Sequence, residues 1–421
     1  MKTTLNKTNT GAQKLVTPAT LQPQNLQQAI TQKIEQAQQQ RITFAEFMEM
    51  ALYHPQFGYY STPGSIIGPQ GDFITSPHMG HDFGEVIVEQ FADMWDALDR
   101  PETFTLMEMG AGQGLVAADA IAHLQKHHPD CFACLHYIVV EKSDALRAEQ
   151  KKRLSHWIDK GVELSWQTLT DIPTHSIVGC AFSNELVDAF PVHWVELHDQ
   201  DLKEMWVTVH DQTFTAVLGE LSTPQLKQYF QNLEIDLTQG YEDSYRTEVN
   251  LAALEWMSQV SEKVKRGYVL TIDYGYTAQR YYSPARSQGT LQCYYRHSHH
   301  NDPFAYVGEQ DITAHVDFTT LENCGKSVGL ETLGFTQQGL FLMALGLGDR
   351  LSALANPTQQ PAQDKPAKPT EIQAIMRRRE ALQQLISPMG LGNFGVLIQG
   401  KGLTPKEIAR PLKGLAIPPL F

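Results

Sequence analysis

The fold of this chain is decided by the stretch Phe104-Thr-Leu-Met-Glu108-Met-Gly110-Ala-Gly112-Gln-Gly114-Leu115. Its first half is apolar and predicts a strand, and the apolar spacing after residue 115 predicts a helix that reaches residue 127. Glycine is needed where a strand turns sharply into a helix and where a ligand comes close to the backbone. The stretch therefore predicts a ligand-binding turn at the carboxyl end of a strand.

Strands and helices alternate along the chain on both sides of this turn. Strands are expected over 103–109, 136–141, 162–166, 177–183 and 268–273, with an antiparallel pair over 330–336 and 393–399. Helices are expected over 84–98, 115–127, 143–157 and 250–265. This alternation predicts an α/β fold with a mostly parallel sheet. We expect a Rossmann-like, seven-stranded class I methyltransferase core with an N-terminal helical lid and an inserted α+β subdomain.

Segments that break the alternation divide the chain into expected domains. These are a disordered lead-in (1–25), an N-terminal lid of helices and loops (26–100), the core (101–191 and 250–340 with 386–402), an inserted β-meander and helical subdomain (192–249), and an insertion with a Pro-rich linker and a charged helix (341–385).

The glycine spacing and two acidic residues favour S-adenosylmethionine over a dinucleotide as the cofactor. A dinucleotide turn reads G-x-G-x-x-G, whereas here the third glycine comes one residue early and is followed by Leu115. Glu108 would repel a pyrophosphate but suits the positively charged methionine end of S-adenosylmethionine. Glu141 ends the next strand, where an acidic residue can accept both ribose hydroxyls.

Five motifs, in order, resemble those of one family. They are Gly71-Asp-Phe-Ile-Thr-Ser-Pro77, the turn Glu108–Gly114, Ser183-Asn-Glu-Leu-Val-Asp-Ala-Phe-Pro191, Ile272-Asp-Tyr-Gly-Tyr276 and Gln310-Asp-Ile-Thr-Ala-His-Val-Asp-Phe318. From about residue 43 to 401 the chain resembles the MidA family, which includes the mitochondrial complex I assembly arginine methyltransferase. The resemblance implies an S-adenosylmethionine-dependent enzyme whose partner is a protein substrate, an arginine-bearing subunit like that of respiratory complex I.

Two carboxylates that follow the fourth strand are the first candidates for catalytic residues in methyl transfer to an arginine. Two carboxylates that clamp the other nitrogens of a guanidinium would orient it and hold its charge near the reacting atom. Glu185 and Asp188 stand at the carboxyl end of that strand, where ligands bind in open α/β sheets. The alternative is that they begin a loop and cap a helix.

A second candidate region contains Asp311 and His315. His315 could accept a proton, because histidine titrates near neutral pH. The same stretch could instead be the start of a helix capped by Thr313 or Asp317. Which of the two regions carries the chemistry is left open.

The expected cofactor residues lie in a loop, in the glycine turn and at strand ends. The loop 72–77 is expected to fold over the cofactor and exclude water, unless it is a plain surface loop. Asn184 is expected to bind the methionine end of the cofactor or the target nitrogen. The full set is Thr75, Ser76, Pro77, Glu108, Gly110, Gly112, Gly114, Glu141 and Asn184.

Other side chains are given structural roles. The lid aromatics Tyr53, Phe57, Tyr59 and Tyr60 are expected mainly to pack, with one or two at the substrate entrance. His297, His299 and His300, with Asp302, have a spacing that could bind a metal. They lie in an irregular stretch without a fixed partner, so no metal is expected.

Composition limits the partners and the location. The formal net charge of −14 opposes binding to a phosphate backbone, so no nucleic-acid partner is expected. No apolar run reaches the roughly 18 residues of a membrane span. Five cysteines, without a disulfide framework or a presequence, predict a cytoplasmic protein. A homodimer is one option for the oligomeric state.

Rival functions use the same core. A closed apolar pocket would favour a small-molecule methyltransferase, and a broad acidic groove would favour a protein substrate. A non-catalytic assembly factor that binds S-adenosylmethionine is a third option. NAD-dependent oxidation is disfavoured by Leu115 and the glycine spacing.

Overall fold

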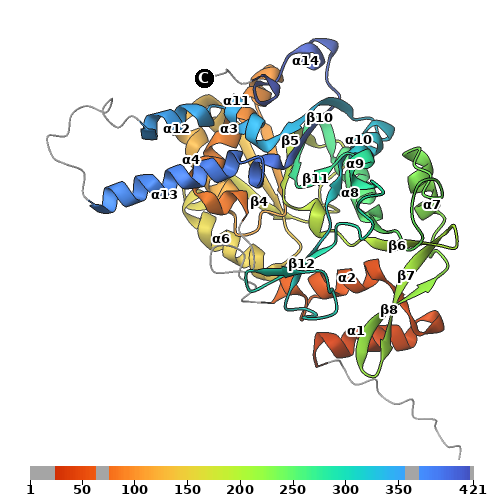
Figure 1. Cartoon of the computed structure of the whole chain (residues 1–421). Helices are drawn as coiled ribbons and strands as arrows, with labels where there is room; N and C mark the ends of the chain where they lie inside the picture. The colour runs from red at the N-terminus through yellow and green to blue at the C-terminus, as the bar shows by residue number, and fades with distance from the viewer. Residues whose placement is uncertain (1–23, 63–74, 356–368, 418–421) are drawn as a thin grey trace, which may run out of the picture.

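A seven-stranded sheet forms the centre of the protein (Figure 1). The computed structural model describes residues 24–62, 75–355 and 369–417. The strand order is β16-β17-β10-β5-β2-β3-β4, in which β17 runs antiparallel to both of its neighbours and the other neighbouring pairs are parallel. The strands are β2 (Phe104–Met109), β3 (Leu135–Val140), β4 (Glu163–Gln167), β5 (Ile177–Asn184), β10 (Val264–Asp273), β16 (Glu331–Gln337) and β17 (Gly395–Lys401). The predicted α/β fold with a class I methyltransferase core is confirmed.

Helices cover both faces of this sheet, because successive strand residues point to opposite sides. Leu106 packs in the cluster on the α3 and α4 face, and Met107 packs in the cluster on the α8 and α10 face (Figure 1). The first face holds α3 (His81–Ala97), α4 (Leu115–His127), α5 (Pro129–Ala133) and α6 (Asp144–Asp159), and the second holds α8 (Leu251–Lys263) and α10 (Phe318–Ser327). The carboxyl ends of the parallel strands are left free for the site.

The C-terminal helices extend the first face. Phe341 of α11 and Leu382 of α13 belong to the same apolar cluster as α3. Arg350 and Arg378 both pair with Asp82 of α3, at 2.7 Å. These helices are α11 (Gln338–Ala344), α12 (Leu347–Ala355), α13 (Pro369–Ile386) and α14 (Pro405–Ala409).

A second, five-stranded sheet packs against the N-terminal helices (Figure 1). Its path is β1-β7-β6-β9, with β8 paired to β7. Phe44 and Phe47 share an apolar cluster with Trp194 and Val207, so the N-terminal segment and the insertion after β5 have a common core. The elements are α1 (Leu26–Gln36), β1 (Ile42–Thr43), α2 (Phe44–Tyr53), β6 (His193–His198), β7 (Asp201–His210), β8 (Thr213–Gly219), α7 (Gln225–Asn232) and β9 (Arg246–Val249).

Short strands between β10 and α10 complete the structure. Cys293 and Ile312 of these strands pack in the same cluster as α2. The elements are β11 (Gly275–Tyr276), α9 (Ala278–Tyr281), β12 (Gln292–Tyr295), β13 (Ser298–His300), β14 (Asp311–Thr313) and β15 (Val316–Asp317). Most of the expected lead-in, the loop residues 72–74 and most of the Pro-rich linker lie outside the described residues.

Candidate active site

A cavity of about 250 Å³ lies at the carboxyl ends of β2, β3 and β5. Seven of the nine residues expected to bind the cofactor line it: Thr75, Pro77, Glu108, Gly110, Gly112, Glu141 and Asn184. A neighbouring hollow of about 310 Å³ shares Gly110 and Glu141 with it. The glycine turn and the acidic residues chosen from the sequence therefore meet around one space.

The three glycines of the turn all have positive φ. A Cβ on Gly110 would lie 2.6 Å from the flexible end of the Leu186 side chain, so the positive φ of 69° is the stronger reason for glycine here. A Cβ on Gly112 would meet no atom within 4 Å, and Gly112 lines the cavity. The open space at Gly112 lets a ligand approach the backbone there.

The two acidic residues of the cavity are held by hydrogen bonds. The Tyr137 hydroxyl donates to Glu108 Oε2 at 2.7 Å, and burial raises the pKa of Glu108 to about 7. The Ser143 backbone N–H donates to Glu141 Oε1 at 2.9 Å, and Gln150 Nε2 donates to Glu141 Oε2 at 3.1 Å. Both carboxylates are thus fixed where a cationic or hydroxyl-bearing ligand could meet them.

Asn184 offers a further polar atom to this space. Its Nδ2 donates to Glu185 Oε1 at 3.0 Å, and its Oδ1 is buried without a hydrogen-bond partner in the described part of the chain. A buried acceptor without a donor is costly. The site therefore fits a ligand that donates a hydrogen bond at Asn184, as the amino group of S-adenosylmethionine can.

Two of the expected cofactor residues do not line the cavity. Gly114 is the N-cap of α4 and packs against Gln150, so its positive φ serves the turn. Ser76 is fully buried, and its backbone N–H donates to Glu185 Oε1 at 2.9 Å. Ser76 therefore holds Glu185 instead of facing the cavity.

Glu185 lies on a strained turn directly after β5. Its φ of 50° is in the left-handed region, which is unfavourable for a residue other than glycine. Asp273, at the end of β10, stabilises the turn because its Oδ2 accepts the backbone N–H groups of Leu186, Val187 and Asp188 at 3.2, 2.9 and 3.3 Å. The strain is thus maintained by a buried carboxylate, as is common at functional sites.

A second and larger space, about 640 Å³, opens on the other side of Glu185. Glu185 and Tyr60 line both this cleft and the cofactor cavity, so the two spaces meet at these residues. Asp188 and Asp311 also line the cleft. The wall of the cleft also includes Tyr274, Tyr276, Gln292, Tyr294, His297, His299, Thr313, His315 and Phe394.

The carboxylates of this cleft are buried and close to aromatic hydroxyls. The Tyr60 hydroxyl donates to Asp311 Oδ1 at 2.7 Å, and Tyr274 hydrogen-bonds to Asp188. Burial raises the pKa of Glu185 to about 7 and that of Asp188 to about 6. Asp188 Oδ1 is buried and has no hydrogen-bond partner among the described residues. A cationic ligand would lower both pKa values and satisfy this oxygen.

His315 is part of the cleft wall and lies between two aromatic rings. It stacks on Tyr276 with ring centroids 5.0 Å apart and meets Tyr274 edge-on at 5.0 Å. Burial lowers the pKa of His315 to about 4, so the ring is neutral at pH 7. Asp317 does cap α10, with Oδ1 accepting the Thr319 N–H at 3.0 Å, whereas Thr313 lies in β14 and is not a cap.

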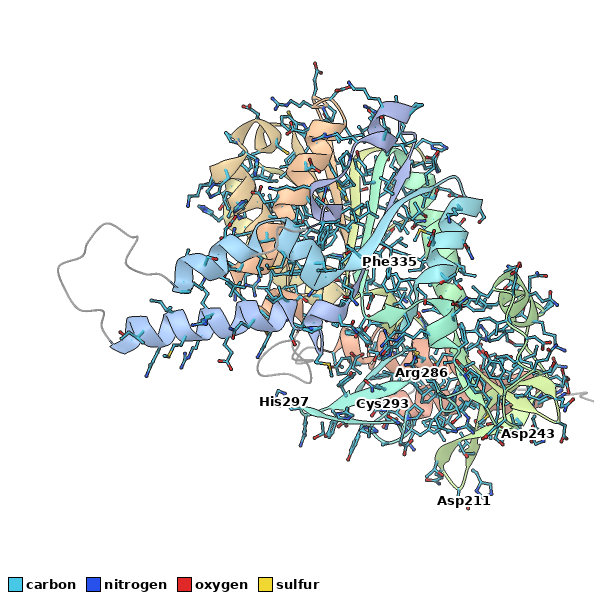
Figure 2. The ribbon with its side chains drawn as sticks, turned by 45° about the horizontal axis from the view of Figure 1, so that its top comes forward. Asp211, Asp243, Arg286, Cys293, His297 and Phe335 are labelled. Carbon is cyan, nitrogen blue, oxygen red and sulfur yellow. The ribbon has the colours of Figure 1, made fainter. Side chains whose placement is uncertain are left out.

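The histidine-rich stretch forms a hairpin at the rim of the cleft. His297 lies at the outer end of the hairpin of β12 and β13, and Cys293 lies further in (Figure 2). His297 and His299 line the cleft, whereas His300 pairs with Cys293 in the hairpin. The stretch thus supplies polar groups to the cleft wall.

Sequence reasoning missed Asp273, Tyr274 and Tyr294. Asp273 carries the same signal that pointed to Glu185, an acidic residue at the carboxyl end of a core strand, but no role was predicted for it. Tyr294 carried no such signal, because the strand that bears it is outside the alternation of the core.

Comparisons with known proteins agree with this geometry. A family model described as "Putative S-adenosyl-L-methionine-dependent methyltransferase" matches residues 86–336. The chain is 29% identical to the mitochondrial protein arginine methyltransferase NDUFAF7 homolog of Drosophila melanogaster, over 74% of this chain and 73% of that one. It is 27% identical to mitochondrial NDUFAF7 of Homo sapiens, over 76% and 74%. A structure from Burkholderia thailandensis bound to S-adenosylhomocysteine is 29% identical, with a TM-score of 0.77, and covers 93% of this chain and 94% of its own.

These relatives overturn one prediction from the sequence. A cytoplasmic location was expected, and it is contradicted because the relatives from flies and humans are mitochondrial proteins. The expectation relied on the missing presequence pattern and on the cysteines, neither of which reports a location directly. Within the described residues, none of the helices has the length and apolar character to cross a membrane.

Proposed function

This chain belongs to the family of S-adenosyl-L-methionine-dependent methyltransferases, and we propose that it methylates an arginine side chain of a protein. The observation that carries the proposal is the position of Glu185, which faces both the cofactor cavity and a cleft with two further carboxylates. A methyl donor and a cationic acceptor bound in the two spaces would meet at Glu185. The arginine methyltransferases among the relatives support this choice of acceptor.

In this proposal the first cavity positions the cofactor. S-adenosylmethionine, when bound, supplies an activated methyl group on a sulfonium cation. Glu141 accepts the ribose hydroxyls, and the backbone at Gly110 and Gly112 allows close approach. Asn184 Oδ1 accepts a hydrogen bond from the amino group at the methionine end, with Glu108 as a nearby negative charge. Thr75 and Pro77 close one side of the cavity and limit access of water.

The second space binds the guanidinium. Glu185 and Asp188 accept hydrogen bonds from two of its nitrogens and leave the third, a terminal nitrogen, directed toward the methyl group. Asp311, held by Tyr60, extends the negative surface along the cleft. Aromatic rings of Tyr274 and Tyr294 line the same cleft and provide faces for a planar cation.

The transfer then needs a proton acceptor. A guanidinium that gains a methyl group must lose one proton to return to a single positive charge. Glu185 is placed to take it, because in this proposal it contacts the guanidinium and also faces the cofactor cavity. His315, neutral at pH 7, offers a second acceptor in the same cleft.

The proposal is tested with labelled cofactor. Lysate from cells that lack this protein is incubated with the purified enzyme and methyl-deuterated S-adenosylmethionine, and proteins and small molecules are analysed separately by mass spectrometry. Deuterated methylarginine in proteins, reduced with Glu185→Gln and Asp188→Asn, is the expected result. Glu102→Gln, which changes an exposed side chain, is the matched control.

The alternatives predict different results in the same experiment. Label in a small molecule alone would indicate a small-molecule methyltransferase. Binding of S-adenosylhomocysteine without labelled product in either fraction would indicate a cofactor-binding assembly factor. Label in proteins on residues other than arginine would contradict the guanidinium clamp.

A further inference from the structure

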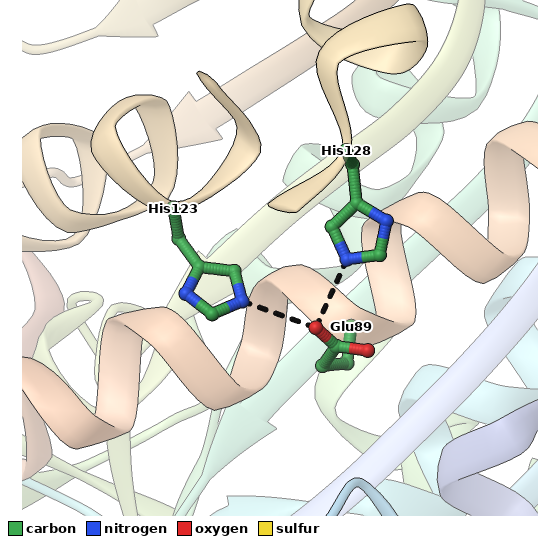
Figure 3. A group of neighbouring side chains, drawn as sticks. All are labelled: Glu89, His123 and His128. Atoms are coloured by element: carbon green, nitrogen blue, oxygen red, sulfur yellow. Dashed lines mark hydrogen bonds and ion pairs between the residues drawn. The ribbon is translucent and has the colours of Figure 1, made fainter. Parts of the chain in front are cut away.

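Three side chains on the helices α3 and α4 form a cluster that the proposed methyl transfer does not use (Figure 3). Glu89 lies in α3, His123 lies in the last turns of α4, and His128 follows the end of α4. Each contributes one potential ligand atom, and these atoms all lie within 4.8 Å of one another. We propose that Glu89, His123 and His128 bind a divalent transition-metal ion, zinc by the chemistry of the ligands.

The ligand set supports zinc. Two imidazole nitrogens and one carboxylate oxygen are a recurrent set of three protein ligands for zinc, with water in the fourth position. Soft thiolates are missing from the cluster, which disfavours copper(I), and the two imidazoles disfavour magnesium and calcium. The same three ligands also bind iron(II) in non-haem enzymes, and zinc is the redox-inactive member of this class that we take as the ion.

The geometry is close to that of a metal site. His123 Nε2 lies 3.1 Å and His128 Nε2 2.9 Å from the same atom, Glu89 Oε1. Two ligands of tetrahedral zinc lie roughly 3.4 Å apart when each is about 2.1 Å from the ion. Small rotations of the two imidazoles would bring the three atoms to these distances, with His123 remaining stacked on the ring of His127 at 4.4 Å between centroids. One cation could then replace the two N–H protons that now point at Oε1.

The burial of these side chains and the charge of Lys413 determine how an ion reaches the site and how tightly it is bound. His123 is 8% exposed, whereas Glu89 and His128 are partly exposed, so an ion can enter from solvent. The second oxygen of Glu89 pairs with Lys413 Nζ at 2.8 Å, which fixes the carboxylate. The same ammonium repels a cation on Oε1, so Lys413 lowers the affinity of the site.

The cluster is remote from the methyl-transfer site. Gly114 and the cofactor cavity are at the start of α4, so along the helix His123 lies about 13 Å and His128 about 20 Å from Gly114. Lys413 precedes Gly414, whose N–H donates to Gln90 Oε1 at 2.8 Å, so the C-terminal segment closes over α3 beside the cluster. An ion here would link α3, the end of α4 and the C-terminal segment. The proposal does not depend on the methyl acceptor.

The test is metal binding by the full chain. The protein is treated with a chelator, dialysed, and titrated with Zn²⁺ by calorimetry and with Co²⁺ by visible absorption. We expect one equivalent of either metal and a cobalt spectrum of nitrogen and oxygen ligation. His123→Gln and Glu89→Gln are expected to weaken binding roughly tenfold or more. The matched control, His210→Gln, removes an exposed histidine of the β7–β8 turn and is expected to bind like wild type.

A variant that is expected to bind zinc more tightly is included, because misfolding alone would abolish binding in His123→Gln and Glu89→Gln but would not strengthen it. Lys413→Met removes the competing ammonium, and we expect about two- to fivefold tighter zinc binding. Binding of S-adenosylhomocysteine shows that each variant is folded. Absence of stoichiometric binding by wild type, equal binding by folded His123→Gln, or unchanged affinity in Lys413→Met would each overturn the proposal. Loss of binding only on substitution of His297 and His299 would move the ion to the cleft hairpin and overturn it as well.

Discussion

Glu185→Gln is predicted to stabilise the protein at pH 8 while it reduces methyl transfer. The ionised side chain is unfavourable in the folded protein, because burial raises its pKa from an ordinary 4.5 to about 7, with the charge of Asp188 acting in the same direction. Each pKa unit corresponds to about 1.4 kcal/mol. The free energy of unfolding should therefore rise by up to about 3 kcal/mol in the glutamine variant, less where water in the cleft screens the charge.

The sign of the pH dependence follows from the raised pKa. Below about pH 4.5, Glu185 is protonated in both the folded and the unfolded protein, so the two proteins should be equally stable. Between pH 4.5 and 7 only the unfolded state loses the proton, and the wild type becomes less stable relative to the variant. Above pH 7 the difference is complete and constant.

The assay is urea denaturation at pH 4.5, 6 and 8, followed by far-ultraviolet circular dichroism. Glutamine keeps an Oε1 that can accept the hydrogen bonds from Ser76 and Asn184, so the turn is preserved in the variant. Glu102→Gln serves as the control for loss of a charge at an exposed position. A stability difference that is the same at pH 4.5 and 8, or a less stable variant at pH 8, would refute the reasoning.

Three further predictions concern the two spaces. Gly112→Val should fold, at a cost of about 1–2 kcal/mol for positive φ, but should lose binding of S-adenosylhomocysteine in calorimetry; normal binding would contradict the placement of the cofactor. Tyr60→Phe removes the 2.7 Å hydrogen bond to Asp311 and should lower stability by about 1 kcal/mol and slow methyl transfer, whereas an unchanged rate would remove Asp311 from the acceptor cleft. The kcat/KM for the acceptor should rise from pH 5.5 to 8, because Asp188 and Glu185 lose protons near pH 6 and 7; a flat profile would exclude them as the clamp.

The core was predictable because its signals are local. The apolar strand before Gly110 and the glycines after it indicate both the strand and the turn, and β3 is followed by the helix α6 in the same way. The resemblance drawn from five motifs, and with it the cofactor, is confirmed by the family match. The two strands β16 and β17 were also predictable as an antiparallel pair.

The substrate side was less predictable because its contacts are distant in sequence. Ile42 pairs with Val207, and Tyr60 hydrogen-bonds to Asp311, across more than half the chain in the second case. No local pattern reports such pairs. Ser76 is a further contact that the sequence does not report: it was expected to bind the cofactor with Thr75 and Pro77, whereas its backbone N–H donates to Glu185. The roles of the site residues and the domain boundaries stay predictions.

The position of β17 has a consequence for the growing chain. This strand is hydrogen-bonded on both sides, between β10 and β16, yet its residues 395–401 follow both of these strands in the sequence. During synthesis β10 and β16 are therefore made long before the strand that must separate them. Until it arrives, their unpaired edges are open to pairing with other chains or with each other. A variant truncated before residue 395 is therefore expected to expose both edges and to aggregate.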